Sequence, residues 1–134
     1  GLRMKQHCSN AEKVITFLET QKKVKNVIYP TNHQGEIKER AKKYLSGGNG
    51  ALVGVDLGTV EAGAKFIDSL KMLYHVANIG DARSLAIHPA STTHSQLSPE
   101  EQLAAGVTPG YVRLSIGIEH PDDIIADIKQ ALAA

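Results

Sequence analysis

The chain has 134 residues, 42% of them hydrophobic, which is enough for one domain with its own core. Its formal net charge is only +1, so no strong positive potential would attract nucleic acid or an anionic membrane. Only 4% of its residues are aromatic, which does not favour a surface for stacking nucleic-acid bases. No apolar run approaches the roughly 18–20 residues that span a bilayer. The lone Cys8 excludes an internal disulfide and fits a reducing compartment, so we expect a cytoplasmic protein.

The first twenty residues predict a helix. Apolar side chains recur at helical spacing, at Met4, Cys8, Ala11, Val14, Ile15 and Leu18. Neither an initiator methionine nor a capping residue precedes the pattern, so we expect a helix cut from a longer chain. The alternative is a helix whose first turn simply frays.

The middle of the chain alternates strands and helices. A strand at 26–29 stops at Pro30, and a helix follows at 35–45 with Ile37, Ala41, Tyr44 and Leu45 on one face. The glycine cluster at 46–50 precedes a strand, not a helix, so it predicts a turn and not a phosphate-binding loop. That strand covers 51–57, and Thr59 then caps a helix. Further strands are predicted at 73–77 and 84–87.

The clearest local signal is the run that starts at Ser98. Ser98 and Glu101 have the spacing of a capping box, Pro99 suits the first helical position, and Gly106 suits the end of the helix. Residues 111–118 alternate as a strand, and a final helix begins at Pro121. The sequence therefore predicts a small α/β (α+β-like) domain, with a mainly antiparallel sheet of four or five strands covered by helices.

Arg113 is the most informative polar residue. It lies in the middle of the strong strand at 111–118, on the face opposite Val112 and Leu114. One interpretation is a solvent-facing arginine on a half-exposed sheet. The other is a guanidinium fork for an anionic ligand, usually a carboxylate, held in bidentate geometry. Composition does not decide between them.

The histidines and hydroxyls between 88 and 95 do not predict a metal site or a catalytic triad. His88 and His94 are six residues apart and no carboxylate cluster joins them, whereas zinc needs three or four ligands at suitable spacing. No Gly-x-Ser-x-Gly nucleophile elbow is present. We expect structural, hydrogen-bonding histidines and turn-forming hydroxyls, and a packed Cys8.

Two motifs nevertheless carry a specific resemblance. They are Asn-Ile-Gly-Asp-Ala-Arg-Ser-Leu-Ala-Ile-His-Pro-Ala-Ser-Thr-Thr-His-Ser at 78–95 and Tyr-Val-Arg-Leu-Ser-Ile-Gly-Ile-Glu at 111–119. With the Leu2-Arg3-Met4 start, they make essentially the whole chain similar to the C-terminal domain of the Cys/Met-metabolism family of pyridoxal-phosphate enzymes, which have fold-type I. The resemblance implies an interdomain helix at 1–20, a C-terminal substrate-carboxylate-binding domain at 21–134 and assembly as a homotetramer.

The resemblance also implies a site. In the family, the arginine that matches Arg113 binds the α-carboxylate of the small-molecule amino-acid substrate, Asn78 lines the same site, and Thr93 lies near it. Asn-Ile-Gly-Asp at 78–81 is similar to the O-acetylhomoserine sulfhydrylase branch, where many relatives have Ser-Leu-Gly. That branch replaces acetate by sulfide or a thiol to give homocysteine or methionine. The alternatives are the methionine γ-lyase or cystathionine γ-synthase branch, or a free, non-catalytic C-terminal fragment that acts as a binding partner.

One departure from the family concerns the cofactor. The Schiff-base lysine of these enzymes lies in a Ser-x-Thr-Lys context, and none of the eleven lysines here stands in such a motif. The resemblance therefore implies that an upstream cofactor-binding domain or chain holds pyridoxal phosphate. We expect no catalytic, cofactor-binding or metal-binding residue in this chain, and no activity from it alone.

Overall fold

A five-stranded sheet in the order β1-β2-β5-β4-β3 forms the centre of the computed structural model, which describes residues 1–134. The strands are β1 (Asn26–Ile28), β2 (Leu52–Asp56), β3 (Tyr74–His75), β4 (Leu85–Ile87) and β5 (Tyr111–Ser115). The pairs β1–β2, β2–β5 and β5–β4 are antiparallel, and only β3–β4 is parallel. The predicted α/β class with a mainly antiparallel sheet is confirmed.

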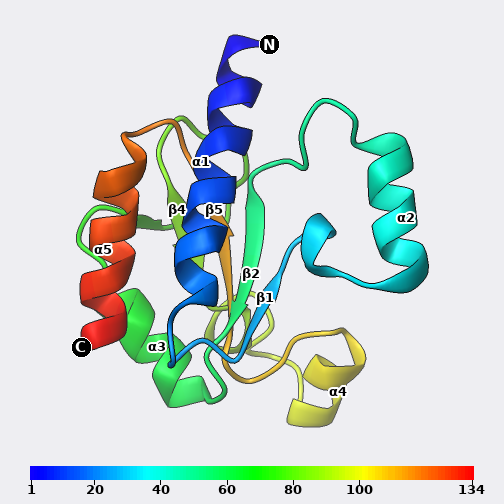
Figure 1. The fold of residues 1–134 in the computed structure, drawn as a ribbon. Coiled ribbons are helices and arrows are strands. Elements are labelled where there is room, and N and C mark those ends of the chain that lie inside the picture. Colours follow the sequence, from blue (N-terminus) through cyan, green and yellow to red (C-terminus); the bar gives the residue numbers. More distant parts are fainter.

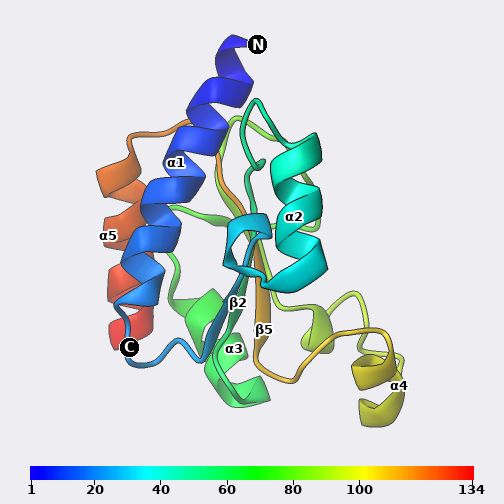
Figure 2. The ribbon, with the colours of Figure 1, turned by 45° about the vertical axis from the view of Figure 1, so that its right-hand side comes forward.

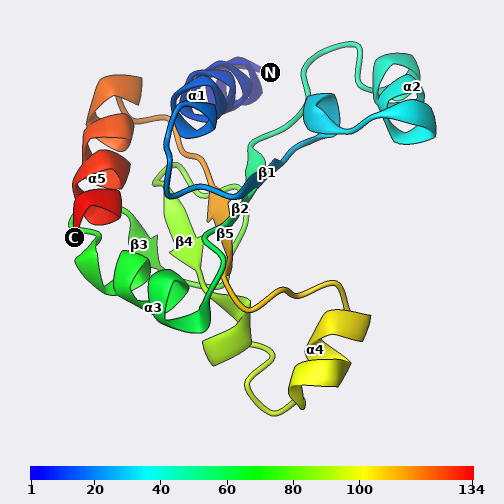
Figure 3. The ribbon, with the colours of Figure 1, turned by 60° about the horizontal axis from the view of Figure 1, so that its bottom comes forward.

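Five α-helices surround this sheet (Figure 1). They are α1 (Leu2–Glu19), α2 (Gly35–Tyr44), α3 (Val60–Ser69), α4 (Pro99–Ala104) and α5 (Pro121–Ala133), with short 3-10 helices at Pro30–Asn32 and Pro89–Ser91. Figure 3 shows α1, α3 and α5 along one side of the sheet, whereas α2 and α4 stand away from that layer. None of these helices combines the length and the apolar character that a membrane crossing requires.

The hydrophobic core lies between the sheet and the layer of α1, α3 and α5. Val112 and Leu114 of β5 point into it and are fully buried, as the alternating pattern predicts. The predicted stripe of α1 supplies Ala11, Val14, Ile15 and Leu18 to the same core. Its Met4 is the exception, since it is 54% exposed. Figure 2 shows α1 and α5 side by side, and both lie apart from α2.

The predicted helix caps are confirmed. Thr59 Oγ1 accepts the Ala62 N–H at 3.1 Å, and Ser98 and Glu101 form a reciprocal capping box at the start of α4. Gly106 follows α4 with φ of 81°, a left-handed conformation in which glycine carries no steric penalty.

Several element boundaries and faces differ from the prediction. The last strand ends at Ser115 and not at residue 118, because the Ile118 N–H turns to the Ala82 carbonyl and leaves the ladder. The strand predicted at 73–77 keeps only two residues as β3. The helix α2 buries only Ala41, so most of its predicted apolar face is exposed. The helix α3 buries Gly63, Phe66 and Ile67, whereas its first residue, Val60, is exposed.

The helix α1 is tied to the rest by buried polar contacts as well as by the core. The His7 ring Nδ1 bonds the Ile116 carbonyl at 2.6 Å, and Asn10 Nδ2 donates to the carbonyls of Gly117 and Glu119 at 3.0 and 2.8 Å. These contacts join α1 to the connection between β5 and α5. The division into a helix at 1–20 and a domain at 21–134 stays a prediction.

Candidate functional site

Arg113 occupies the centre of the sheet on the face opposite the layer of α1, α3 and α5. Its cross-strand neighbours are Gly54 on β2 and Ile87 on β4. Because side chains two residues apart on a strand share a face, Tyr111 and Ser115 flank it along β5. The Arg113 side chain is half-buried, so the guanidinium is desolvated in part while one side remains open to a ligand.

The ring of Tyr111 forms one wall beside Arg113. It lies directly over Gly54, where an added Cβ atom would come within 2.6 Å of the Tyr111 Cε2 atom. Burial raises the pKa of the Tyr111 hydroxyl, and the nearby positive charge of Arg113 opposes this only in part. The ring therefore stays neutral at physiological pH and presents an apolar surface next to the guanidinium.

The structure brings Arg113 and Asn78 together, but through the main chain of Asn78. Arg113 Nη2 donates to the Asn78 backbone carbonyl at 3.3 Å. The Asn78 side chain turns to its own neighbour, since its Oδ1 accepts the Ile79 N–H at 2.8 Å. The role of Asn78 in a site stays a prediction, and the group of Asn78 that contacts Arg113 is one that every residue type carries.

The Arg113 guanidinium has unused hydrogen-bonding capacity. Its Nε atom is buried and has no hydrogen-bond partner, and Arg113 takes part in no ion pair. A buried donor without an acceptor costs roughly 1–3 kcal/mol. An anionic acceptor that pairs with Nε and a terminal nitrogen, after a small shift of the guanidinium, would remove this cost and compensate the charge.

Thr93 is not joined to these residues by a hydrogen bond. Its hydroxyl lies 2.9 Å from His94 Nδ1 on an exposed segment, so its place in the site stays a prediction. His88 is a structural histidine, as expected: it is buried, with Nδ1 2.8 Å from Ser91 Oγ and Nε2 2.7 Å from the Pro109 carbonyl. No group of three or more histidine, cysteine or acidic side chains is placed to hold a metal ion.

Two pockets adjoin this face of the sheet. The larger, of about 500 Å³, lies between α2 and the sheet; Tyr111 and Arg113 line it together with apolar residues such as Ile37 and Leu52. The second, of about 330 Å³, lies between the first two turns of α1, Ile79–Gly80 and Ser115. No lysine lines either pocket.

Two contributors to the site were missed by sequence reasoning. Ser115 Oγ accepts the Gly80 N–H at 3.3 Å, and Arg3 Nη2 donates to the Gly80 carbonyl at 2.7 Å. The position of Ser115, two residues after Arg113 on one strand, could have indicated that both side chains face the same loop. Arg3 carried no such signal, because its partner is a main-chain carbonyl 77 residues away.

Comparison with known proteins gives one consistent result. Residues 1–133 match the family described as Cys/Met metabolism PLP-dependent enzyme. An O-acetyl-L-homoserine sulfhydrylase of Leptospira meyeri is 53% identical over 98% of this chain and 30% of its own length. An L-methionine gamma-lyase of Fusobacterium nucleatum subsp. polymorphum is 44% identical over 98% of this chain and 33% of its own length.

A solved structure agrees. It comes from Campylobacter jejuni subsp. jejuni, is assigned as an O-acetylhomoserine (thiol)-lyase and contains a pyridoxyl-lysine phosphate. It superposes with a TM-score of 0.91 at 42% identity, over 99% of this chain and 32% of that one. The chain thus spans about a third of the length of the relatives it matches.

Proposed function

Since the chain belongs to the Cys/Met-metabolism family of pyridoxal-phosphate-dependent enzymes, we propose that it is the substrate-carboxylate-binding part of an O-acetylhomoserine sulfhydrylase. Arg113 would bind the α-carboxylate of the amino-acid substrate, beside the Tyr111 ring and the Asn78 main chain. The complete enzyme would replace the acetate of O-acetylhomoserine by sulfide or a thiol.

One observation carries this proposal: the buried, unpartnered Nε–H of Arg113 next to an open side of the guanidinium. No acidic side chain compensates the charge, so the site attracts an anion of the kind that a guanidinium binds in bidentate fashion. A carboxylate is the anionic group that every amino-acid substrate carries. This contact would hold the substrate in one orientation, which contributes to catalysis through positioning and not through proton transfer.

Pyridoxal phosphate, the cofactor of the family, does not fit the residues of this chain. The pockets on either side of the Arg113 region contain no lysine to bond it, and no lysine stands in a Ser-x-Thr-Lys context. When bound, the cofactor stabilises carbanions on the amino acid. We therefore propose that another part of the complete enzyme holds it, and that this chain alone is inactive.

The choice of the sulfhydrylase branch has its own support. Asn-Ile-Gly-Asp stands at 78–81, in the loop whose backbone contacts Arg113, and the Leptospira sulfhydrylase is more similar to this chain than the Fusobacterium lyase. The second candidate is a methionine γ-lyase, which the 44% identity of that relative keeps open. Both candidates use the same carboxylate contact, so they differ in the reaction and not in the role of Arg113.

The test of the carboxylate role uses a polypeptide in which this chain follows the cofactor-binding part of the enzyme. Arg113→Ala removes one charge-assisted contact worth about 1.5–3 kcal/mol, so we expect the KM for O-acetylhomoserine to rise about 10- to 150-fold. The matched control is Arg40→Ala, because Arg40 is an exposed arginine on the wall of the same larger pocket. An unchanged KM in the Arg113 variant would contradict the proposal.

The cofactor claim is tested on the 134-residue chain itself. We expect that added pyridoxal phosphate gives no lysine-bound absorbance band and that borohydride fixes no cofactor at a specific lysine. Stoichiometric labelling of one lysine would show that the chain does hold the cofactor.

A further inference from the structure

The loop at 76–83, which connects β3 to β4, carries the main-chain group that contacts Arg113. Residues 76–80 are exposed and have no regular secondary structure, so the sheet ladder does not hold them. An exposed segment of this kind moves unless side chains fix it. The position of the Asn78 carbonyl therefore depends on a small number of identifiable contacts.

Two side chains of β5 reach this loop at matching positions. Arg113 donates to the Asn78 carbonyl, and Ser115, two residues later on the same face, accepts the Gly80 N–H at 3.3 Å. Residues 78 and 80 of the loop are thus aligned with residues 113 and 115 of the strand. Gly80 has φ of 75°, so the loop bends here in a conformation that L side chains rarely adopt.

Arg3 holds the other side of the same residue. Its Nη2 atom donates to the Gly80 carbonyl at 2.7 Å, so the N–H and the C=O of Gly80 are fixed by two different elements. The Arg3 charge also acts on the next residue. The pKa of Asp81 lies below its ordinary value, chiefly because the Arg83 N–H bonds the carboxylate, with a smaller contribution from the charges of Arg83 and Arg3.

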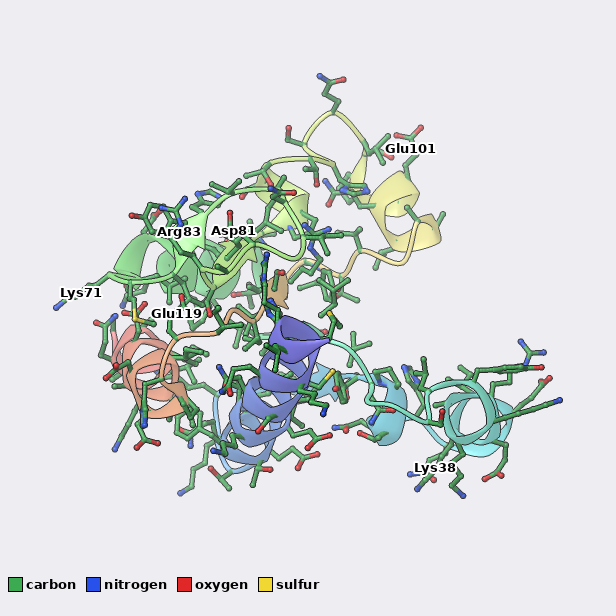
Figure 4. All side chains as sticks on the ribbon, turned by 90° about the horizontal axis from the view of Figure 1, so that it is seen from above. Lys38, Lys71, Asp81, Arg83, Glu101 and Glu119 are labelled. Carbon is green, nitrogen blue, oxygen red and sulfur yellow. The ribbon has the colours of Figure 1, made fainter.

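Arg3 extends from a rigid support. The helix α1 is anchored one and two turns later by His7 and Asn10, which bond the carbonyls of residues 116, 117 and 119. Glu119 in turn accepts the Ser84 N–H at 2.6 Å and the Ser84 hydroxyl at 2.9 Å, and so fixes the far end of the loop. Figure 4 shows, from above, the labelled Glu119 between the loop that carries Asp81 and Arg83 and the helix α5.

We propose that Arg3 is a positioning residue of the carboxylate site: by holding Gly80, it keeps the Asn78 carbonyl against Arg113 and so fixes the guanidinium for the substrate. This inference rests on the proposed function of Arg113. Binding groups need a second layer of contacts that restricts their orientation, and a loosened layer weakens binding without removing the binding group itself. The start of α1 is thereby coupled to substrate binding.

The first test measures the loop directly in the protein by nuclear magnetic resonance. In Arg3→Ala we expect the Gly80 amide to exchange its hydrogen about 3- to 10-fold faster, as the loss of one exposed, charge-assisted hydrogen bond implies, and the Arg113 Nε–H resonance to shift. Arg3→Lys retains a cationic donor group and should restore part of both signals. The control is Lys5→Ala, an exposed cation on the same helix whose side chain makes no hydrogen bond. Wild-type exchange and resonance in Arg3→Ala would overturn the inference.

The second test is kinetic and uses the complete enzyme. Arg3→Ala should raise the KM for O-acetylhomoserine about 3- to 10-fold, with kcat at saturation and the KM for sulfide unchanged. In an Arg113→Ala background the same substitution should add nothing, because Arg3 acts through Arg113. An equal, additive effect in that background would show a general structural role and overturn the inference.

The two proposals fail in different ways. If Arg113→Ala leaves the KM for the amino acid unchanged, the proposed function fails, whatever Arg3 does to the loop. If Arg113→Ala raises this KM while Arg3→Ala does not, the positioning role alone fails and the carboxylate contact stands.

Discussion

Gly63 of α3 lies against the imidazole of His88, so closely that an added Cβ atom would stand 2.6 Å from the ring Nε2. The ring is 1% exposed and both of its nitrogens are hydrogen-bonded, to Ser91 and to the Pro109 carbonyl. It therefore has no free position to move into. Glycine at residue 63 is required for the approach of α3 to the segment that follows β4.

This contact predicts whether Gly63→Ala raises or lowers the stability of the protein. Ala normally stabilises a helix interior by about 1 kcal/mol relative to Gly, but in Gly63→Ala we expect overpacking to lower the free energy of unfolding by about 1–3 kcal/mol. Urea unfolding followed by circular dichroism measures it. Gly47→Ala is the control, since nothing lies within 4 Å of a Cβ atom there. A more stable Gly63→Ala protein would show that the His88 ring yields.

The hydrogen bonds of Asp127 in α5 lead us to expect a loss of stability in acid. Its carboxylate accepts the backbone N–H groups of Lys71, Met72 and Leu73 at 2.9, 2.8 and 3.0 Å. Burial by itself raises the pKa of Asp127, but these hydrogen bonds outweigh it and hold the pKa below its ordinary 3.8. A carboxyl group whose pKa falls on folding stabilises the fold above its unfolded pKa, and this contribution is lost as pH falls through the folded pKa.

Asp127→Asn should therefore lower the free energy of unfolding at pH 7 by about 1.5–3 kcal/mol, the range for hydrogen bonds to a charged group. The difference from the wild type should shrink below pH 4, where the wild-type carboxylate also begins to lose its charge. Urea unfolding at pH 7, 5 and 3 gives both values. The control is Asp68→Asn, at an exposed aspartate of α3, which should change neither the stability at pH 7 nor its pH dependence. If Asp127→Asn differs from the wild type by the same free energy at all three pH values, the Asp127 carboxylate is not the source of the acid sensitivity.

The buried Tyr29 leads us to expect a loss of stability at alkaline pH as well. The side chain is 2% exposed and its hydroxyl donates to the Gly50 carbonyl at 2.8 Å. Burial, with the negative charges that Cys8 and Glu12 can carry, raises the pKa of Tyr29 to about 12. Since the unfolded chain releases this proton near pH 10 and the folded chain does not, stability should fall as pH rises from about 10 to 12.

Tyr29→Phe should cost about 1 kcal/mol at pH 7, through the lost hydrogen bond, and should show a shallower decline above pH 10. Thermal unfolding at pH 7, 10 and 11 measures both effects. Tyr44→Phe serves as the control because that side chain is 69% exposed. An alkaline decline that is equally steep in both variants would assign it to other groups.

We expect the substitution Gly54→Ala to displace the Tyr111 ring at the candidate site. The new methyl group would occupy the space of the Tyr111 ring, 2.6 Å from Cε2, and would press on Ile28 at 3.0 Å. We expect the ring to move towards solvent, so that the pKa of Tyr111, which burial raises, returns towards 10. A titration followed by the ¹³Cζ resonance of each tyrosine measures it, with exposed Tyr44 as the internal reference. An unchanged Tyr111 titration would mean that Ile28 absorbs the methyl group instead.

Much of the fold could be predicted because its signals are local. The alternation at 111–118 places Val112 and Leu114 in the core and Arg113 on the other face, and the Ser98–Glu101 spacing specifies the start of α4. These patterns depend on neighbours within a turn or a strand. Boundaries that depend on distant partners were less predictable: β3 is short because it pairs only with β4 at the edge of the sheet.

The candidate site likewise combines a residue that the local sequence indicates with contacts to distant residues that it does not. The type and the position of Arg113 indicated an anion-binding group, but its contact with Asn78 uses a backbone carbonyl, which no residue type reveals. The contact of Arg3 with Gly80 is of the same kind. The apolar spacing of Ile37, Ala41, Tyr44 and Leu45 on α2 is a local pattern that could be read from the sequence, yet only Ala41 is buried, and burial depends on the packing of distant elements.

The order of the strands has a consequence for folding. The strand β5 comes last in the chain but occupies the centre of the sheet, so β1–β2 and β4–β3 remain two separate ladders until it inserts between them. During synthesis the open edges of β2 and β4 would be exposed to pairing with other chains. The strand that closes both edges also delivers Arg113. A nascent protein therefore gains its proposed ligand-binding residue only in the step that covers the open edges of β2 and β4.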